Sequence, residues 1–310
     1  MPTSVHSHNP LRKRADVGIG PYELYRMFSD VLLTVDFDRT MTGPDSKIPQ
    51  RNLDAVAFFM EHGGSFTINT GRSVSSFKKH MGKVPVNAPI LMYNGSARWE
   101  NGALTDLKLL DMDLWETVQT VRREFPGMNL EIQGVDYHYL IEPEDAYVAF
   151  YNALKWGYRI VQPGEDLGPF LKFALAGSPR NKSVATLFDI DDAEDARFDA
   201  AQARILELWG DKVEVYRAAP RIIDVHAKGV SKIAAARQLQ RELGKKILIC
   251  AGDAENDIPM LEGADYAYCP AGSVVADRFE TVCHCAEGAI ADVIYKKIPE
   301  ILTLSLDNVD

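Results

Sequence analysis

Short apolar runs that end in polar, often glycine-containing turns recur along the chain. Four of these runs cover residues 31–35, 65–68, 90–93 and 247–250. Near-continuous apolar runs of this length are typical of strands that are buried on both faces of a parallel sheet. We therefore expect these segments to be strands of one parallel sheet.

Helical spacing of apolar residues occurs between these runs. The i, i+3, i+4, i+7 pattern covers residues 53–60 and 233–243, and a shorter stripe covers residues 74–81. Alternation of strands and helices is typical of an α/β fold with a doubly wound, Rossmann-like parallel sheet. This is the fold class that the pattern predicts.

The middle of the chain has a different pattern. From residue 97 to residue 220 the apolar runs are shorter, alternate more, and are separated by helical stretches. A segment of this length is a typical domain, so we expect residues 97–220 to form an inserted α+β domain. The sheet is expected to resume near residue 222, which divides the core into residues 21–96 and 221–310 and leaves residues 1–20 as a flexible tail.

Composition excludes several classes of protein. The 310 residues are 46% hydrophobic and 25% charged, which excludes wholesale disorder. The net charge of −10 makes nucleic acid an unfavourable partner, although a local site can still bind a small anion. We find no apolar run long enough for a membrane span and no secretory signal. Four cysteines, including the Cys283-x-Cys285 pair, are too few for a disulfide scaffold, so we expect reduced thiols and a cytoplasmic protein.

Two acidic residues follow the first predicted strand. Asp36 and Asp38 stand two residues apart after residues 31–35, so an extended backbone places both on one side. Two close carboxylates repel each other unless a cation lies between them or one is protonated. A hard divalent ion such as Mg²⁺ fits this pattern. A turn with two solvated aspartates fits the segment equally well when it is taken alone.

A second acidic segment follows the last predicted strand. In Gly252–Asp257, the glycine lets the backbone turn and Asp253 projects from the strand end. Asp253 could complete a cation site with the first two aspartates, and Asn256 and Asp257 could bond to that site or to metal-bound water. The simpler alternative is a helix N-cap acid with a polar first turn.

Candidate anion-binding groups occur in two further places. Thr70 and Gly71 lie between the second strand and a helix, where a hydroxyl and free backbone N–H groups favour an anionic oxygen. Lys232 lies in the first turn of a predicted helix, where a cation is unfavourable unless it meets an anion. The simpler alternatives are N-capping by Thr70 or Ser73 and a solvent-exposed Lys232.

Taken together, the four segments are more specific than any one of them. Three acids for a cation, with a hydroxyl and an ammonium for an anion, are typical of a phosphoryl-transfer site. The chain resembles the haloacid dehalogenase (HAD) superfamily of phosphohydrolases, and within it the Cof-like class IIB group. The segments DFDRT, NTGR, KGVSK and GDAENDIPM resemble its four motifs in the family's order. The insertion occupies the position of the class IIB cap, and Tyr93–Gly95 resembles the segment before that cap.

The resemblance implies a role for each matching residue. Asp36 is the implied nucleophile, which becomes an aspartyl phosphate, and Asp38 is the implied acid and base. The implied Mg²⁺ ligands are Asp36, the backbone carbonyl of Asp38 and Asp253, with Asp257 supporting the metal shell or the lysine. Phosphoryl oxygens are expected to meet the following groups: the Thr70 hydroxyl, the Lys232 ammonium, the Asn256 side chain and the N–H groups of Phe37 and Gly71.

The chain departs from the family pattern at Arg39, where glycine is usual. A positive φ at this position would strain the backbone, and we expect the side chain to face solvent. The third motif contains two lysines, Lys228 and Lys232, and the family's spacing favours Lys232. His226 and Cys250 flank motifs and are interpreted as packing residues.

The resemblance implies a Mg²⁺-dependent phosphatase for a small phosphorylated metabolite, either a sugar phosphate or a phosphorylated cofactor. A phosphomutase of the same fold and a non-catalytic sensor of phosphorylated ligands remain alternatives, and the oligomeric state is left open. Cap loops are expected to determine specificity. Residues 133–139, Lys172 and Arg180 could contact the substrate, but we interpret them as residues on an exposed sheet face.

Overall fold

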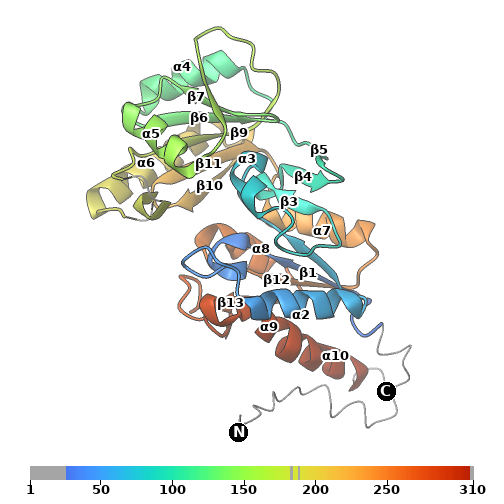
Figure 1. Ribbon diagram of the computed structural model, residues 1–310. Coiled ribbons are helices and arrows are strands. Elements are labelled where there is room, and N and C mark those ends of the chain that lie inside the picture. The colour runs from blue at the N-terminus through green and yellow to red at the C-terminus, as the bar shows by residue number, and fades with distance from the viewer. Residues whose placement is uncertain (1–25, 182–183, 188, 308–310) are drawn as a thin grey trace.

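The computed structural model describes residues 26–181, 184–187 and 189–307. The predicted tail, residues 1–20, lies outside the described residues. Two layered regions stack on each other, with strands β6–β11 in one and the β1, β2, β12 and β13 strands in the other (Figure 1). No described helix is long and apolar enough to cross a membrane.

The first region contains a five-stranded parallel sheet in the order β14-β13-β12-β1-β2. Its strands are β1 Val31–Val35, β2 Ser65–Ile68, β12 Ile247–Ala251, β13 Tyr266–Pro270 and β14 Glu280–Val282. The prediction of a parallel α/β sheet is confirmed. Because β1 lies inside the sheet between β2 and β12, its carboxyl end is flanked by the ends of both neighbours.

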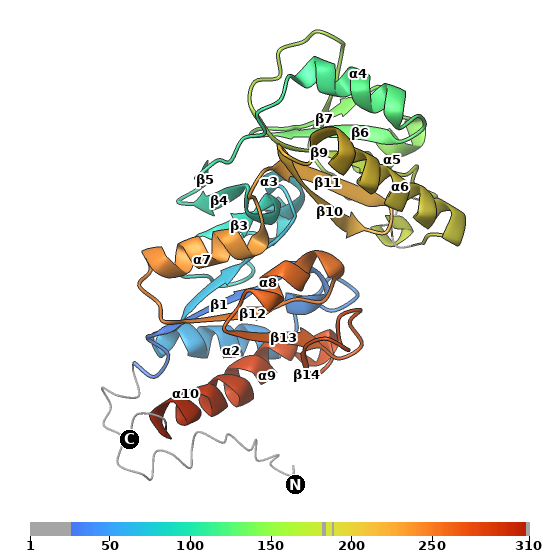
Figure 2. The same ribbon diagram turned by 180° about the vertical axis from the view of Figure 1, so that it is seen from behind.

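Helices cover both faces of this sheet (Figures 1 and 2). They are α2 Gln50–Glu61, α9 Ala289–Asp292 and α10 Ile298–Asp307 on one side, and α7 Lys232–Glu242 and α8 Ile258–Glu262 on the other. Alternate β1 residues serve the two layers: Leu33 packs with the α2 side and Leu32 packs with the α7 side. Burial on both faces explains why β1 is apolar at nearly every position.

The predicted strand near residue 90 is present, but it does not belong to the parallel sheet in which we expected it. β3 Ile90–Met92 pairs in antiparallel fashion with β4 Ala97–Glu100, which pairs with β5 Ala103–Thr105. A single parallel bridge between Asn69 and Leu91 joins this small sheet to the edge of the main one. Residues 97–105, which we had expected in the insertion, therefore pair with a strand of the core segment.

The second region is a six-stranded sheet in the order β10-β11-β9-β6-β7-β8. Its strands are β6 Asn129–Gly134, β7 His138–Ile141, β8 Tyr158–Val161, β9 Phe170–Ala176, β10 Val213–Ala219 and β11 Ile222–Ala227. The expectation that the first sheet resumes near residue 222 was wrong. β11 pairs with β9 and β10 in the second sheet, because a two-residue connection after β10 makes an antiparallel hairpin.

The helices that accompany this sheet are α4 Leu114–Glu124, α5 Asp145–Leu154 and α6 Asp192–Trp209, in agreement with the helical stretches expected in the insertion. Val121 of α4 and Ile205 of α6 pack into the apolar face of the sheet, with Ile132 and Phe173. The opposite face is directed toward the first region, where the short helix α3 Val74–Phe77 meets it.

Candidate active site

Asp36 lies at the carboxyl end of β1 and is 8% exposed. Its backbone N–H donates to the Ala251 carbonyl at 2.8 Å, so the first residue after β1 is tied to the last residue of β12. The Lys232 ammonium donates to Asp36 Oδ1 at 2.5 Å and to Asp257 Oδ1 at 2.6 Å. Lys232 is 3% exposed, which excludes the solvent-facing alternative. Residues almost 200 positions apart are thus joined in one buried ion-pair cluster.

A third carboxylate joins this cluster. Asp36, Asp253 and Asp257 each offer a carboxylate oxygen, and these oxygens lie within 4.8 Å of one another. Thr40 Oγ1 donates to Asp253 Oδ1 at 3.1 Å, so the segment after β1 orients the aspartate that follows β12. Asp257, rather than Asp253, receives the turn's backbone N–H groups, at 3.0 and 3.1 Å. The N-cap alternative therefore does not describe Asp253.

Burial and mutual repulsion make these carboxylates reluctant to ionise together. Burial raises the pKa of Asp36 well above its ordinary value, and the Lys232 ammonium offsets burial and the neighbouring carboxylates only in part. Burial, together with Asp257, raises the pKa of Asp253 to about 7. Burial lowers the pKa of Lys232, but Asp257 and Asp36 outweigh it and raise that pKa. The cluster is therefore short of positive charge.

The turn after β1 meets the condition under which Arg39 strains the backbone. Arg39 has φ of +58°, in the left-handed region, and it is exposed. This turn sends Asp38 to one side, while Thr40 is buried against Asp253. The aromatic ring of Phe37 packs into the core, and its centroid lies 4.8 Å from the centroid of the Phe77 ring.

Asp38 is held by a residue that the sequence analysis left without a role. Arg72 donates from Nε to Asp38 Oδ2 and from a terminal nitrogen to Asp38 Oδ1, each at 2.7 Å. The same guanidinium donates to the Ser76 carbonyl at 3.0 Å. Such a two-point contact fixes the plane of the carboxylate. The NTGR segment contained a signal for it, since the arginine immediately follows the threonine and glycine singled out above.

Thr70 and Gly71 lie beside the cluster at the end of β2. Ser73, and not Thr70, caps α3, because its side chain accepts from the Ser76 N–H. The Thr70 hydroxyl accepts from the Arg72 N–H at 3.2 Å and lines the cavity. A side chain at Gly71 would come within 2.8 Å of Asn94 Oδ1, so only glycine permits this close approach.

A cavity of about 610 Å³ lies between the strand ends and the second sheet. The predicted residues that line it are Asp36, Asp38, Thr70, Gly71, Asp253, Asn256 and Asp257. Lys232 adjoins it through Asp36, whereas Phe37 contributes no surface to it. The second region contributes Glu131, Gln133, His138, Lys172 and Asp224. Polar residues of both regions thus line one cavity.

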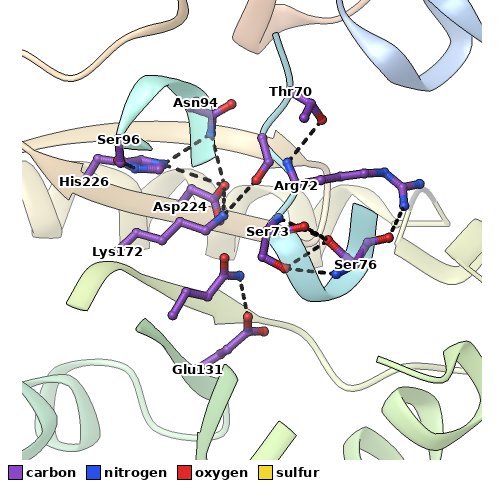
Figure 3. A network of polar contacts seen from close by, with 12 residues as sticks. Thr70, Arg72, Ser73, Ser76, Asn94, Ser96, Glu131, Lys172, Asp224 and His226 are labelled. Carbon is purple, nitrogen blue, oxygen red and sulfur yellow. Dashed lines mark hydrogen bonds and ion pairs between the residues drawn. The ribbon is translucent and has the colours of Figure 1, made fainter. Parts of the chain in front are cut away.

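The expectation that Lys172 lies on an exposed sheet face was wrong. Lys172 is 3% exposed and donates to Asp224 Oδ2 at 2.6 Å and to the Gly71 carbonyl at 3.4 Å (Figure 3). Asn94 also donates to Asp224, at 3.3 Å, and contacts His226, which in turn meets Ser96 at 2.8 Å. His226 is therefore fully buried, as a packing residue would be, but within a polar network. A lysine inside the apolar run FLKFALA was the available signal.

The other residues considered from the sequence lie away from the cavity. Lys228 contacts Glu214 at 3.3 Å on the surface, and Arg180 pairs with three acids there, including Glu194 at 3.0 Å. Cys250 packs in the apolar layer under α7. All four cysteines are free thiols.

Comparison with known proteins places this arrangement in a family. The model of haloacid dehalogenase-like hydrolases matches residues 33–272. A 5-amino-6-(5-phospho-D-ribitylamino)uracil phosphatase of Bacillus subtilis is 24% identical over 238 residues, which cover 75% of this chain and 80% of that protein.

Solved structures resemble the whole two-region fold. A protein of Streptococcus mutans superposes with a TM-score of 0.72 at 16% identity, covering 86% of this chain and 98% of its own. A sugar phosphatase of HAD subclass IIB gives a TM-score of 0.66 at 17% identity and covers 86% of this chain and 99% of its own. The class IIB fold expected from the motifs is consistent with these likenesses.

Proposed function

This chain belongs to the haloacid dehalogenase-like hydrolases, and we propose that it is a Mg²⁺-dependent phosphatase acting on phosphomonoesters of small metabolites through an aspartyl phosphate at Asp36. The observation that carries this proposal is the contact of Lys232 with Asp36 at 2.5 Å beside the carboxylates of Asp253 and Asp257. A buried nucleophile, its cation and a metal-type acid cluster meet at the floor of one cavity.

The acid cluster fits Mg²⁺ by its chemistry. Its donors are hard carboxylate oxygens, as this ion prefers, and the raised pKa values of Asp36 and Asp253 show that positive charge is in deficit. Asp36 and Asp253 would hold the ion, with Asp257 behind them and the Asp38 carbonyl as a further oxygen. Bound Mg²⁺ would neutralise charge on the transferring phosphoryl group.

The chain's own residues would perform the chemistry in two steps. An Asp36 carboxylate oxygen attacks phosphorus, and the bond to the leaving oxygen breaks as Asp38 gives that oxygen a proton. Asp38, now a carboxylate, takes a proton from a water molecule, whose oxygen attacks phosphorus and releases inorganic phosphate and free Asp36. Lys232 and the Thr70 hydroxyl would stabilise the phosphoryl oxygens, with Asn256 and the N–H groups of Phe37 and Gly71 as further donors.

The leaving group would occupy the rest of the cavity. At about 610 Å³, this space has the size of a typical small-molecule site. The Bacillus relative acts on a phosphorylated ribitylamino-uracil, and the structural relative is a sugar phosphatase. A sugar phosphate or a phosphorylated cofactor is therefore the substrate class that we propose.

Release of phosphate from p-nitrophenyl phosphate tests the proposal. The wild-type chain is expected to release phosphate with Mg²⁺ and to lose this activity with EDTA. Asp36→Asn is expected to lower kcat by at least about a thousandfold, since the amide is no nucleophile. Asp54→Asn on the exposed side of α2 is the matched control and is expected to retain full activity.

Two results would contradict the proposal. One is turnover that survives in Asp36→Asn. The other is a product in which phosphate has moved to another position without release, which would indicate a phosphomutase. Binding of a phosphorylated ligand without any turnover would favour a sensor over the proposed enzyme.

Binding of Mg²⁺ can be tested separately by thermal unfolding. Mg²⁺ is expected to raise the midpoint of thermal unfolding of the wild-type chain but not of Asp253→Asn.

A further inference from the structure

One face of the second sheet is polar and yet buried. The strand register places His138, Gln133, Lys172 and His226 in one row across β7, β6, β9 and β11. The next row contains Glu131 and Asp224. All six side chains are at most 7% exposed, because this face covers the cavity above the strand ends. We call these six residues the polar wall.

The polar wall carries no surplus positive charge. Lys172 is neutralised by Asp224 at 2.6 Å, and each of these side chains is 4% exposed. Glu131 adds a further negative charge: burial raises its pKa, but His138, Tyr151 and Lys172 outweigh burial and hold it at about 2. His138, which contacts Glu131 at 2.9 Å, can at most balance that charge.

Glu131 determines which way the Gln133 amide points. An ionised carboxylate only accepts hydrogen bonds, so Gln133 must present its Nε2 group to Glu131, and that hydrogen bond is present. Gln133 Oε1 is thereby turned away from Glu131. It is buried and accepts no hydrogen bond from any described residue, while the Lys172 ammonium is directed to Asp224 and the Gly71 carbonyl instead.

Gln133 is 7% exposed and lines the same cavity as Asp36 and Asp38. A second cavity, of about 780 Å³, is also lined by Arg39 and Asp253 but by neither Asp36 nor Asp38. A group leaving from phosphorus at Asp36 therefore enters the space that Gln133 faces. The aromatic residues Tyr147, Phe150 and Trp156 also line this space.

We propose that Gln133 determines substrate specificity by accepting, at Oε1, a hydrogen bond from a hydroxyl of an uncharged leaving group. The polar wall thereby selects hydroxylated, electrically neutral leaving groups and rejects those that carry a second phosphate or a carboxylate. This inference rests on the proposed phosphatase function and adds to it the group that is recognised. A buried acceptor left without a donor is costly, so an analogue lacking the hydroxyl binds the transition state less well.

Comparison of substrates with the wild-type chain tests the inference without any variant. The panel contains hexose 6-phosphates and pentose 5-phosphates, each beside its single-deoxy analogues, and p-nitrophenyl phosphate as a reference. For the best sugar phosphate, loss of one particular hydroxyl is expected to lower kcat/KM by about tenfold or more. Fructose 1,6-bisphosphate is expected to be hydrolysed at least about tenfold less efficiently than fructose 6-phosphate.

The outcomes separate the two proposals. No turnover of any compound would overturn the phosphatase function itself. Turnover of p-nitrophenyl phosphate, with every deoxy analogue within twofold of its parent, would overturn the role of a hydroxyl while the function stands. Preference for the bisphosphate would overturn the charge argument in the same way.

Substitution then assigns the effect to Gln133. Gln133→Leu is expected to bring the ratio of kcat/KM between the parent sugar and its deoxy analogue close to one. Gln119→Leu, on the exposed surface of α4, makes the same change away from the cavity and is expected to keep the wild-type ratio. If Gln133→Leu does not fold, Gln133→Asn retracts the acceptor by one carbon and is expected to reduce the ratio. An unchanged ratio in a folded variant would overturn the assignment to Gln133.

Discussion

Arg72 places its guanidinium against both carboxylate oxygens of Asp38, with two hydrogen bonds of 2.7 Å. Asp38 is half exposed at the cavity, whereas Arg72 is largely buried and anchored to the Ser76 carbonyl. The more exposed side chain is thus held by the more buried one. These hydrogen bonds fix the orientation of Asp38, which is the proposed acid and base. We therefore regard Arg72 as a positioning residue.

Arg72→Lys is expected to lower kcat by about tenfold or more with a smaller change in KM. A lysine keeps the positive charge but cannot make two parallel hydrogen bonds to one carboxylate. Steady-state kinetics with p-nitrophenyl phosphate measure this split. Arg204→Lys, in a surface ion pair with Glu124, is the control and is expected to behave as wild type. An unchanged kcat in Arg72→Lys would show that Asp38 is oriented without it.

The protein is expected to be more stable with glycine at position 39 than with alanine there. Both substitutions remove the same side chain, but only glycine adopts a φ of +58° without steric strain. Arg39→Gly should therefore exceed Arg39→Ala by about 1 kcal/mol in the free energy of unfolding, measured with denaturant. Arg123 in α4 provides the opposite control, because glycine is less stable than alanine inside a helix. Equal stabilities at position 39 would contradict the strain.

Lys172→Met is expected to lower the free energy of unfolding by about 3–5 kcal/mol, since it leaves the buried Asp224 carboxylate without its cation. The double variant Lys172→Met/Asp224→Leu removes both charges and is expected to recover much of that loss. Lys246→Met breaks the exposed pair with Asp30 and should cost less than about 1 kcal/mol. A double variant that is no more stable than Lys172→Met would show that the loss of stability in Lys172→Met does not come from the unpaired Asp224 carboxylate.

Acid is expected to destabilise the protein partly through Asp224. Burial raises the pKa of Asp224, but Lys172 and His226 outweigh burial and hold it at about 2. A lowered pKa in the folded state stabilises the protein above the ordinary aspartate pKa, and this contribution is lost as the pH falls toward 2. Denaturant unfolding between pH 5 and pH 2 measures it, with an expected share of about 2 kcal/mol. The double variant Lys172→Met/Asp224→Leu should show a shallower loss, and an equal loss would contradict the assignment.

Local sequence patterns were sufficient for three strands of the parallel sheet, β1, β2 and β12, and for the helices α2 and α7 that cover it. Val31–Val35 and Ile247–Ala251 are apolar on both faces, and that pattern requires helices on both sides of a sheet. Arg39 stands where the resembled family has glycine, and the folded chain gives it a positive φ. Pattern failed at β11, because alternation in a strand does not show which sheet it joins.

The candidate site residues could be selected from the chain alone: acids and polar groups at strand ends and a lysine at a helix start each break an apolar or helical pattern. Which groups they contact depends on the folded arrangement. Lys172 and Gln133 read as one exposed, alternating sheet face, yet they are buried, because the core region covers that face. The hydrogen bonds from Arg72 to Asp38 join two segments that are distant in sequence. Contacts of this kind produce no periodic pattern in the sequence. Alternation records that one side of a strand is polar, but whether water or another part of the protein covers that side is settled by packing over long distances in sequence.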